Sequence, residues 1–286
     1  MQNQNFKNIT IGFIGQGWIG KNYADHFEDR GFSIVRYSLE EPYVKNKEAI
    51  RTCDIVFVAV PTPTTPEGFD DSYVRSTLTL VGKGATVVIK STIPPGLTAR
   101  LDAEHEHLYI IHIPEFLREA HARYDVDNHE RLIIGIPKDT PEYHERAELL
   151  RSIHPRTNYS KIVLSHEAEM IKYAHNTIGY ATVVFANLLY DLAQANGIEW
   201  ETVKEAVLSN PWFPEKYLNP VHQGGRGAGG HCFIKDFATL ALLYKEHHPD
   251  DKEGNALLAA FINKNNQLLR DSGKDLDLLK GVHGED

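Results

Sequence analysis

The segment Ile9-Thr10-Ile11-Gly12-Phe13-Ile14-Gly15-Gln16-Gly17-Trp18-Ile19-Gly20 decides the fold of the first half of the chain. Its apolar beginning predicts a strand, residues 18–30 predict a helix, and residues 32–37 predict a second strand. In that setting Gly15 permits a tight turn, Gly17 lets a pyrophosphate approach the backbone, and Gly20 lets the helix pack closely on the strand. The N–H groups at the helix start also favour phosphate. We therefore predict that a dinucleotide binds at Gly15, Gln16, Gly17, Trp18, Ile19 and Gly20, in preference to a plain strand–turn–helix connection.

Short apolar runs rich in β-branched residues continue this pattern along the chain. They cover residues 55–60, 86–90, 108–112 and 132–136, with helical or loop segments between them. Such runs are typical of strands buried on both faces, and their alternation with helices indicates a parallel sheet. We predict a Rossmann-like, doubly wound α/β domain over residues 1–164, followed by an all-α domain over residues 165–286.

A long helix opens the second predicted domain. Ser165 suits an N-cap, acidic residues follow in the first turn, and Asn196-Gly197 supplies a stop. The helix would have about 30 residues and a length of roughly 45 Å. Because it is apolar on several sides, we expect residues 165–196 to form a homodimer interface. Further helices are predicted near residues 200–209, 235–246 and 251–270, and the polar last dozen residues are expected to be frayed.

The composition is that of an ordinary globular protein, and it bounds the partners. The chain has 286 residues, of which 42% are hydrophobic and 24% charged, with a formal net charge of −9. An acidic chain without a dense Lys/Arg run argues against nucleic acid or an anionic membrane as partner. We see no signal core and no apolar run of membrane-spanning length, so we expect a cytoplasmic setting. Histidine pairs such as His105 and His107 lack a third ligand at metal spacing, so no metal site is predicted.

The end of the second strand carries an unusual residue for a dinucleotide-binding fold. An Asp or Glu normally binds the ribose hydroxyls there, but this chain has Ser38, with Arg36 before it and Glu40 after it. Ser38 with Arg36 would suit the 2′-phosphate of NADP, whereas Glu40 could replace the missing acid. We favour NAD and leave NADP open.

A cysteine stands beside a glycine-rich loop in the second domain. Five of the seven residues 224–230 are glycine, and His231-Cys232-Phe233-Ile234-Lys235-Asp236 follow them. A thiol just before a helix and close to a lysine is expected to have a lowered pKa, and the glycines would let the backbone close around a ligand. A structural cysteine after a linker is the other interpretation, and we favour the nucleophile. Cys53 leads into a buried strand and is assigned to packing, so no disulfide is expected.

Polar residues on the long helix and after two strands complete the candidate set. Lys172 and Asn176 are spaced i, i+4 and share a helix face, where a buried amine could stabilise a developing alkoxide. Taken alone, that pair fits a solvated face better. The segments 91–96 and 114–119 each follow a predicted strand, at the edge where open α/β sheets bind ligands, although ordinary turns would explain them equally well.

Six stretches together resemble the UDP-glucose/GDP-mannose dehydrogenase family. They are GFIGQGWIG, DIVFVAVPTPT, VVIKSTIPPG, IPEFLREA, EMIKYAHNT and GGHCFIKDF, in the family's order and at about its spacing. The resemblance implies an NAD-binding domain joined to a long dimer-forming helix. It also implies the oxidation of a sugar CH2OH group to a carboxylate with two NAD, and a nucleotide sugar or sugar derivative as substrate.

The resemblance further implies roles for single residues. Cys232 would capture the aldehyde as a thiohemiacetal, and Lys172 and Asn176 would stabilise the oxyanion. Asp236 would support Lys172 or a water, and Thr92 and Glu115 would orient the water that hydrolyses the thioester. Cofactor contacts or support of the site are implied for Val60, Pro61, Thr62, Thr92 and Glu119.

The chain also departs from the family pattern. Ser38 replaces the ribose acid, Ile113 stands where a polar residue is usual, and Ile234 replaces a proline. Family members continue into a third domain that holds much of the substrate's nucleotide, and we expect this chain to be a short form without it. Two alternatives therefore stay open: a one-step hydroxyacid dehydrogenase of the 6-phosphogluconate type, and a non-catalytic or partner-dependent dinucleotide-binding remnant.

Overall fold

The computed structural model describes residues 9–212 and 215–284, and their contacts divide the chain into two units. The first unit comprises residues 1–62 and 71–172, and the second comprises residues 63–70 and 173–286. Within the described ranges, no helix combines the length and the apolar character that crossing a membrane requires.

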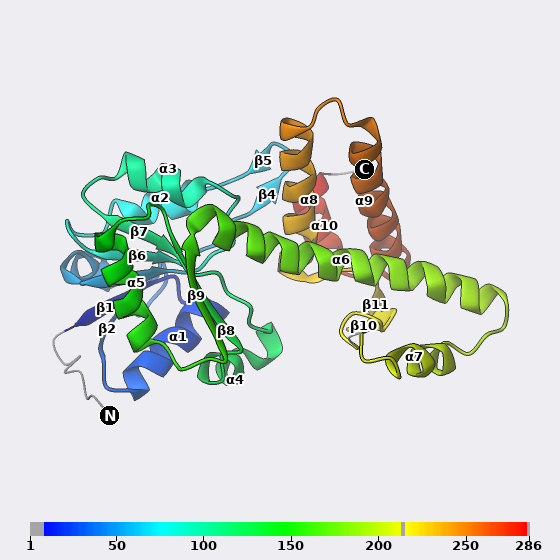
Figure 1. The fold of residues 1–286 in the computed structure, drawn as a ribbon, viewed down its shortest axis with the longest axis horizontal. Coiled ribbons are helices and arrows are strands. Elements are labelled where there is room, and N and C mark those ends of the chain that lie inside the picture. Colours follow the sequence, from blue (N-terminus) through cyan, green and yellow to red (C-terminus); the bar gives the residue numbers. More distant parts are fainter. Residues whose placement is uncertain (1–8, 213–214, 285–286) are drawn as a thin grey trace. The chain divides into compact units, whose positions relative to one another are not determined.

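The first unit is built on a seven-stranded sheet in the order β2-β1-β3-β6-β7-β8-β9 (Figure 1). All neighbouring strands run parallel except β7 and β8, which pair antiparallel at His112 and Gly135. The predicted Rossmann-like α/β fold is confirmed. Its strands are β1 (Thr10–Ile14), β2 (Ser33–Tyr37), β3 (Ile55–Val58), β6 (Thr86–Ile89), β7 (Tyr109–His112), β8 (Arg131–Ile136) and β9 (Tyr159–Leu164). Its helices are α1 (Trp18–Asp29), η2 (Val44–Thr52), α2 (Ser72–Leu78), α3 (Leu97–Glu104), η3 (Glu119–His121), α4 (Ala122–Asp127) and α5 (Pro141–Ile153).

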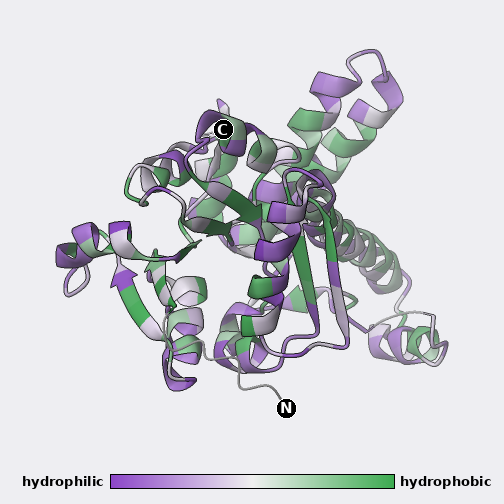
Figure 2. Cartoon of the chain, turned by 60° about the vertical axis from the view of Figure 1, so that its left-hand side comes forward, coloured by the Kyte–Doolittle hydropathy of each residue, from purple (hydrophilic) through white to green (hydrophobic). Residues whose placement is uncertain are grey.

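Alternate residues of the strands bury one face of this sheet against helices. Phe13, Phe57 and Val88 point to the face of the sheet that α1 covers, where they pack with Tyr23 and Phe27 of α1. Residues of α4 and α5 complete this cluster. Because successive strand residues point to opposite faces, the other half of each strand is left for α2 and α3. The central strands are correspondingly hydrophobic throughout (Figure 2). This double cover explains why their sequences are continuous apolar runs rather than alternating ones.

The second unit is mainly helical. The long helix α6 (Ser165–Ala195) has the predicted extent, and a short hairpin of β4 (Thr64–Thr65) and β5 (Gly68–Phe69) belongs to this unit although it comes early in the sequence. Thr64 explains that membership, because its hydroxyl lies 2.7 Å from the hydroxyl of Thr239. The remaining elements are α7 (Trp200–Leu208), β10 (Val221–His222), β11 (Gly225–Arg226), α8 (Gly230–His247), α9 (Lys252–Ser272) and α10 (Leu276–His283).

The unit boundary differs from the predicted boundary at residue 165. The first two turns of α6 pack on the first unit, where Glu169 accepts hydrogen bonds from the backbone of Gly96 and Thr98 at 2.5 and 2.8 Å. Gly135 of β8 is in contact with the same turns, because a Cβ there would lie 2.6 Å from the Cβ of Ala168. The helix is therefore shared between the units, and the division falls at Lys172 and Tyr173.

Two further elements differ from the sequence prediction. Strand β9 was not expected, because its first half is exposed and carries polar residues, yet it pairs with β8 along its whole length. Residues 276–283 of the segment expected to be frayed are helical, and its last two residues lie outside the described ranges. Leu279 of α10 is buried against Ile234 and Leu269, and these contacts order a segment that its polar composition alone would leave loose.

His112 of β7 is a buried imidazole that makes the stability of the first unit depend on pH. It is fully buried, and burial, aided by the charges of Lys90 and Lys172, lowers its pKa to about 3. An unfolded histidine titrates near pH 6.5, so the unfolded state takes up a proton first and stability is lost as pH falls below that value. Between pH 6.5 and 5.5 we expect this residue alone to lower the free energy of unfolding by about 1 kcal/mol.

Urea unfolding at these two pH values tests this expectation. The variant His112→Asn should show a smaller fall in the free energy of unfolding than the unmodified chain, whereas His121→Asn, at an exposed histidine, should show the same fall. An equal fall in all three proteins would contradict the assignment to His112.

Candidate active site

The glycine turn between β1 and α1 has the geometry that the sequence predicts. Gly15 has a φ of +91°, and a Cβ there would lie 2.2 Å from the carbonyl oxygen of Ala59. A Cβ at Gly20 would lie 1.9 Å from the carbonyl oxygen of Gly15. A Cβ at Gly17 would meet nothing within 4 Å, and α1 begins there with no side-chain cap and no acidic residue in its first turn. Packing requires Gly15 and Gly20, while the open space at Gly17 and the positive helix end fit a pyrophosphate.

The three other residues of the turn hold its shape. The side-chain amide of Gln16 donates to the carbonyl oxygen of Gly15 at 3.1 Å, and the carbonyl oxygen of Trp18 accepts from Asn22 at 2.6 Å. Ile19 packs against the core of the first unit. Of the three glycines of the turn, Gly17 is exposed, at the position where a pyrophosphate would approach the backbone.

Arg36 bears on the choice between NAD and NADP. Its guanidinium lies 2.6 Å from the carboxylate of Asp25 and 2.5 Å from that of Glu28. Although burial opposes it, these two carboxylates raise the pKa of Arg36. A guanidinium paired in this way is not available to a 2′-phosphate, so the geometry favours NAD. Ser38 folds the chain after β2 through a hydrogen bond of 3.2 Å to the carbonyl oxygen of Glu40, whose side chain is exposed.

The ends of β3 and β6 are tied together at the carboxyl edge of the sheet. The hydroxyl of Ser91 donates to the carbonyl oxygen of Val60 at 2.6 Å, and the hydroxyl of Thr62 donates to that of Thr92 at 2.9 Å. Pro61 between them is exposed. The structure thus brings Val60, Pro61, Thr62 and Thr92 together, at the edge where open α/β sheets bind ligands.

The two acidic residues predicted after β7 have different surroundings. Glu115 is buried, with its carboxylate 2.8 Å from the amine of Lys90. Glu119 is exposed at the start of η3. Lys90 is not among the residues predicted for the site, although the sequence carries a signal for it, because a charged residue directly ends the apolar run of β6.

Lys172 is buried on α6 within the first unit. Only 7% of it is exposed, and its amine lies 5.3 Å from the centre of the Phe116 ring. Arg131 approaches the same ring at 4.9 Å. Contacts between cations and an aromatic face compensate part of the cost of burying an amine. The structure therefore places Lys172 in a buried environment and not on a solvated face.

Asn176 and Asp236 come together in the second unit, and Cys232 lies on the same helix as Asp236. Asp236 is fully buried, accepts a hydrogen bond of 2.6 Å from the Asn176 amide, and is paired at 2.6 Å with the amine of Lys235. Cys232 lies one turn before Asp236 on α8, so the two share a helix face. Cys232 lies in the first turn of α8 and not before the helix as expected, because α8 begins at Gly230. Lys235, which is expected to lower the pKa of the thiol, is paired with Asp236.

The glycine-rich loop before Cys232 is packed against the residues before α10. A Cβ at Gly229 would lie 2.0 Å from a carboxylate oxygen of Asp275, and a Cβ at Gly225 would lie 2.7 Å from the Cβ of Lys274. Asp275 also accepts a hydrogen bond of 2.8 Å from the backbone N–H of Gly230. Packing within the unit therefore accounts for part of the glycine content that the sequence analysis assigned to ligand binding.

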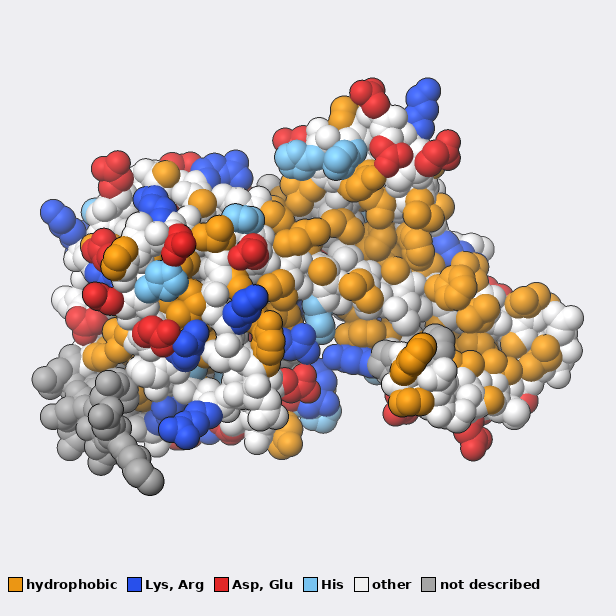
Figure 3. Space-filling model, viewed as in Figure 1, with side chains coloured by type: hydrophobic (Ala, Val, Ile, Leu, Met, Phe, Trp, Pro, Cys, Tyr) orange, Lys and Arg blue, Asp and Glu red, His pale blue; other side chains and the backbone are white. Residues whose placement is uncertain are grey.

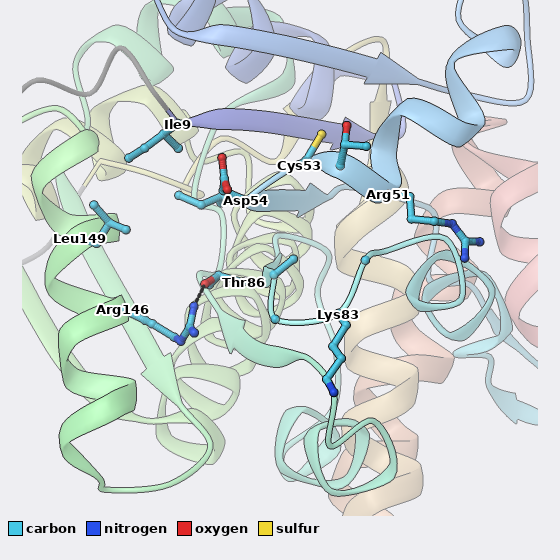
Figure 4. Close-up of a pocket in the computed structure, with 13 residues that line it drawn as sticks. Ile9, Arg51, Cys53, Asp54, Lys83, Thr86, Arg146 and Leu149 are labelled. Carbon is cyan, nitrogen blue, oxygen red and sulfur yellow. Dashed lines mark hydrogen bonds between the residues drawn. The ribbon is translucent and has the colours of Figure 1, made fainter.

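A cavity of about 350 Å³ lies at the other edge of the sheet, around the starts of β3 and β6 (Figure 4). Arg146 points to Thr86 there and donates to its hydroxyl at 2.7 Å, while Lys83 points away. Cys53 also lines the cavity, and burial, with a smaller effect of Asp54, raises the pKa of its thiol to about 11. None of the predicted site residues lines this cavity, and Cys53 stays protonated at neutral pH, in line with its assignment to packing.

Comparison with known proteins identifies both units. Residues 38–156 match the NAD binding domain of the UDP-glucose/GDP-mannose dehydrogenase family, and residues 166–275 match its central domain. The UDP-glucose 6-dehydrogenase of Rickettsia conorii is 31% identical, over 91% of this chain and 67% of its own length. Other curated relatives are matched over about half of their length, such as the putative UDP-glucose 6-dehydrogenase YtcA of Bacillus subtilis, at 49%.

Solved structures agree with this match. A UDP-glucose dehydrogenase from Pyrobaculum islandicum superposes with a TM-score of 0.77 at 26% identity, over 95% of this chain and 72% of that one. The 3-hydroxyisobutyrate dehydrogenase of Mycobacterium tuberculosis shares the fold, with a TM-score of 0.70 at 14% identity over 96% and 98% of the two chains. The first unit is thus an NAD-binding domain, and the chain belongs to the UDP-glucose/GDP-mannose dehydrogenase family.

Proposed function

We propose that this chain catalyses the NAD-dependent oxidation of the primary alcohol of a nucleotide sugar to a carboxylate, with Cys232 holding the intermediate covalently. The observation that carries the proposal is the hydrogen bond of 2.6 Å between Asn176 and Asp236. It links the long helix to the cysteine helix, so an amide donor and a thiol are held in one region of the second unit. This hydrogen bond brings together two residues that are 60 positions apart in the sequence.

The first oxidation needs a group that stabilises negative charge on oxygen. When bound, NAD accepts a hydride, that is two electrons and a proton nucleus, from the alcohol carbon. As the hydroxyl proton leaves, charge develops on the oxygen, and the buried amine of Lys172 and the amide of Asn176 are the donors that would stabilise it. The product of this step is an aldehyde.

The second oxidation needs the aldehyde to stay bound. The sulfur of Cys232 would attack the aldehyde carbon, forming a C–S bond and a thiohemiacetal. Loss of a second hydride and the hydroxyl proton converts this adduct to a thioester. Water then adds to the thioester carbon, the C–S bond breaks, and the acid leaves with the thiol restored. Two NAD are reduced and one water is consumed for each alcohol.

Counting the reduced cofactor tests this proposal. The purified chain is incubated with NAD or NADP and with UDP-glucose or GDP-mannose, and NADH and acid are measured together. We expect two NADH for each acid formed, and activity with NAD in preference to NADP. One NADH for each substrate would instead indicate a one-step hydroxyacid dehydrogenase. Cofactor binding without turnover on any nucleotide sugar would indicate a non-catalytic or partner-dependent module.

We further propose that the chain forms a homodimer through α6. Hydrophobic side chains gather along this helix (Figure 3). Ile178, Phe185 and Leu192 are seven residues apart and are 67%, 57% and 62% exposed, with Leu188 and Leu189 exposed between them. Large apolar side chains recurring on one face of a soluble helix are typical of an interface, because water would otherwise cover them.

Charge placed on this face should weaken the dimer. We expect the double variant Phe185→Glu/Leu192→Glu to raise the dimer dissociation constant by at least about 100-fold, because two carboxylates would be buried without partners. Sedimentation velocity over a range of concentrations measures the change. Gln194→Glu adds a charge at an exposed polar position of the same helix and should leave the dissociation constant unchanged. A monomeric unmodified chain, or a double variant that dimerises normally, would exclude this interface.

A further inference from the structure

A buried ion pair lies at the carboxyl edge of the sheet in the first unit. Lys90 directly follows β6, and Glu115 comes three residues after β7. Because β6 and β7 are parallel neighbours with Ile89 opposite His112, the residues that follow them emerge at the same edge. The amine of Lys90 lies 2.8 Å from the carboxylate of Glu115, and the two side chains are only 2% and 5% exposed.

Other parts of the first unit surround this pair with titratable side chains. Tyr23 of α1 places its ring 4.2 Å below the amine of Lys90, and its hydroxyl is hydrogen-bonded to Nε2 of His129. His154, after α5, packs edge-on against Tyr23, and His112 lies on β7 near Lys90 and Lys172. Burial is the main cause that lowers the pKa of His129 to about 4 and that of His154 well below its ordinary value. These imidazoles are therefore neutral near pH 7, and Lys90 is the cation that pairs with Glu115.

Lys90 is the main group that lowers the pKa of Glu115. Burial by itself would raise the pKa of this carboxyl, but the charge of Lys90, with smaller effects of His129 and of a hydrogen bond from Tyr23, holds it below its ordinary value. The backbone N–H of Phe116 donates to the other carboxylate oxygen at 2.9 Å. The carboxylate is thus fixed at both oxygens, by a cation on one side and by an N–H group on the other.

We propose that Lys90 is a positioning residue, which keeps Glu115 ionised and fixes its orientation at the carboxyl edge of the sheet. The inference rests on the proposed function, together with the role that the family resemblance implies for Glu115, the orientation of the water that hydrolyses the thioester. An ionised carboxylate accepts a hydrogen bond from that water and takes up its proton as the oxygen bonds to the thioester carbon. The C–S bond then breaks with Cys232 as the leaving thiolate, and the proton passes from Glu115 to solvent. A protonated Glu115 could not accept it.

The chain offers a matched control for this ion pair. Lys138 lies at the same distance, 2.8 Å, from the carboxylate of Asp102, which is also buried. Asp102 is hydrogen-bonded to Tyr143 and to the backbone N–H of Ile110, at the beginning of β7 and not at its carboxyl end. The Lys138 side chain is 54% exposed, so the control matches Lys90 in distance and in its buried carboxylate but not in the burial of the amine. Removing the amine of Lys138 therefore breaks an ion pair to a buried carboxylate that has no part in the proposed reaction.

The test compares Lys90→Met, Lys90→Arg and Lys138→Met with the unmodified chain. We expect Lys90→Met to move the acidic limb of the kcat–pH profile upward by about one pH unit or more, because Glu115 then becomes protonated nearer to neutral pH. Lys90→Arg, which restores a cation, should largely recover the original limb, and Lys138→Met should not move it. If Lys90→Met does not fold, Lys90→Arg and the neutral pair Lys90→Met/Glu115→Gln are used instead. The neutral pair should fold and show no acidic limb from Glu115.

A second measurement does not depend on turnover. Carbon-13 NMR of the glutamate carboxyl carbons, with Glu115→Gln to assign the signal, follows the ionisation of Glu115 in the whole chain. We expect the signal to stay at its ionised position from pH 5 to 8 in the unmodified chain and to titrate within this range in Lys90→Met. An unchanged signal and an unchanged pH profile in Lys90→Met would overturn the assignment. If no nucleotide sugar is oxidised, the proposed function fails while the NMR titration still decides the role of Lys90.

Discussion

Replacement of Cys232 by alanine is expected to lower acid formation by about a thousandfold or more, because the aldehyde can no longer be held by a covalent bond for its second oxidation. Cofactor binding should be retained, since Cys232 lies in the second unit and the glycine turn lies in the first. The measurement is the yield of acid and NADH from UDP-glucose, together with the affinity for NADH from its fluorescence.

The second cysteine supplies the control for this experiment. Cys53 is also a reduced thiol, but it lies at the amino edge of the sheet, where burial raises its pKa to about 11. Cys53→Ala should therefore keep the full yield of acid. Full conversion to acid by Cys232→Ala would show that the sulfur is not a nucleophile, and the covalent route would have to be abandoned.

Gly15→Ala is expected to lower the free energy of unfolding by about 3 kcal/mol or more, since the residue has a positive φ and its new Cβ would collide with a backbone carbonyl. The oxygen of Ala59 would lie only 2.2 Å away, and neither main chain can move without disturbing β1 or β3. Urea unfolding followed by circular dichroism measures the loss.

Gly17→Ala separates cofactor binding from folding in the same turn. Its Cβ would meet nothing within 4 Å, so the free energy of unfolding should change little. The same Cβ would occupy the space where a pyrophosphate approaches the backbone, so the dissociation constant for NAD should rise at least about tenfold. Equal stability of the two variants would contradict the packing argument, and unchanged NAD affinity in Gly17→Ala would contradict the placement of the pyrophosphate.

The fold could be predicted where local signals were strong. The apolar runs, the glycine turn and the start and stop signals of the long helix located most of the strands and α6 within one or two residues. Strand β9 and helix α10 escaped prediction because contacts with residues distant in sequence order them. Tyr159 and its neighbours pair with β8, and Leu279 packs on Leu269. The polarity of neighbouring residues gives no information about these contacts, so they could not be predicted from the local sequence.

The candidate site could be predicted as a set of residue types but not as a set of contacts. The motifs pointed to Cys232, Lys172, Asn176 and Asp236, and the structure brings Asn176 to Asp236. They also suggested that Lys235 acts on the thiol, whereas the structure pairs it with Asp236. The helix starts earlier than expected, which places Lys235 beyond the first turn and next to a buried carboxylate that needs a cation.

By itself, the sequence determined most of the central strands, the long helix, the glycine turn and the residue types available for chemistry, because these depend on patterns over a few neighbouring residues. Only the tertiary structure decided the partner of each buried charge: Glu115 for Lys90, Asp25 and Glu28 for Arg36, and Asp236 for Lys235. Burying a charge is costly unless a partner lies close enough to compensate for the lost hydration. For Lys90 and Arg36, sheet order and helix packing set those distances between segments that are separate in the sequence.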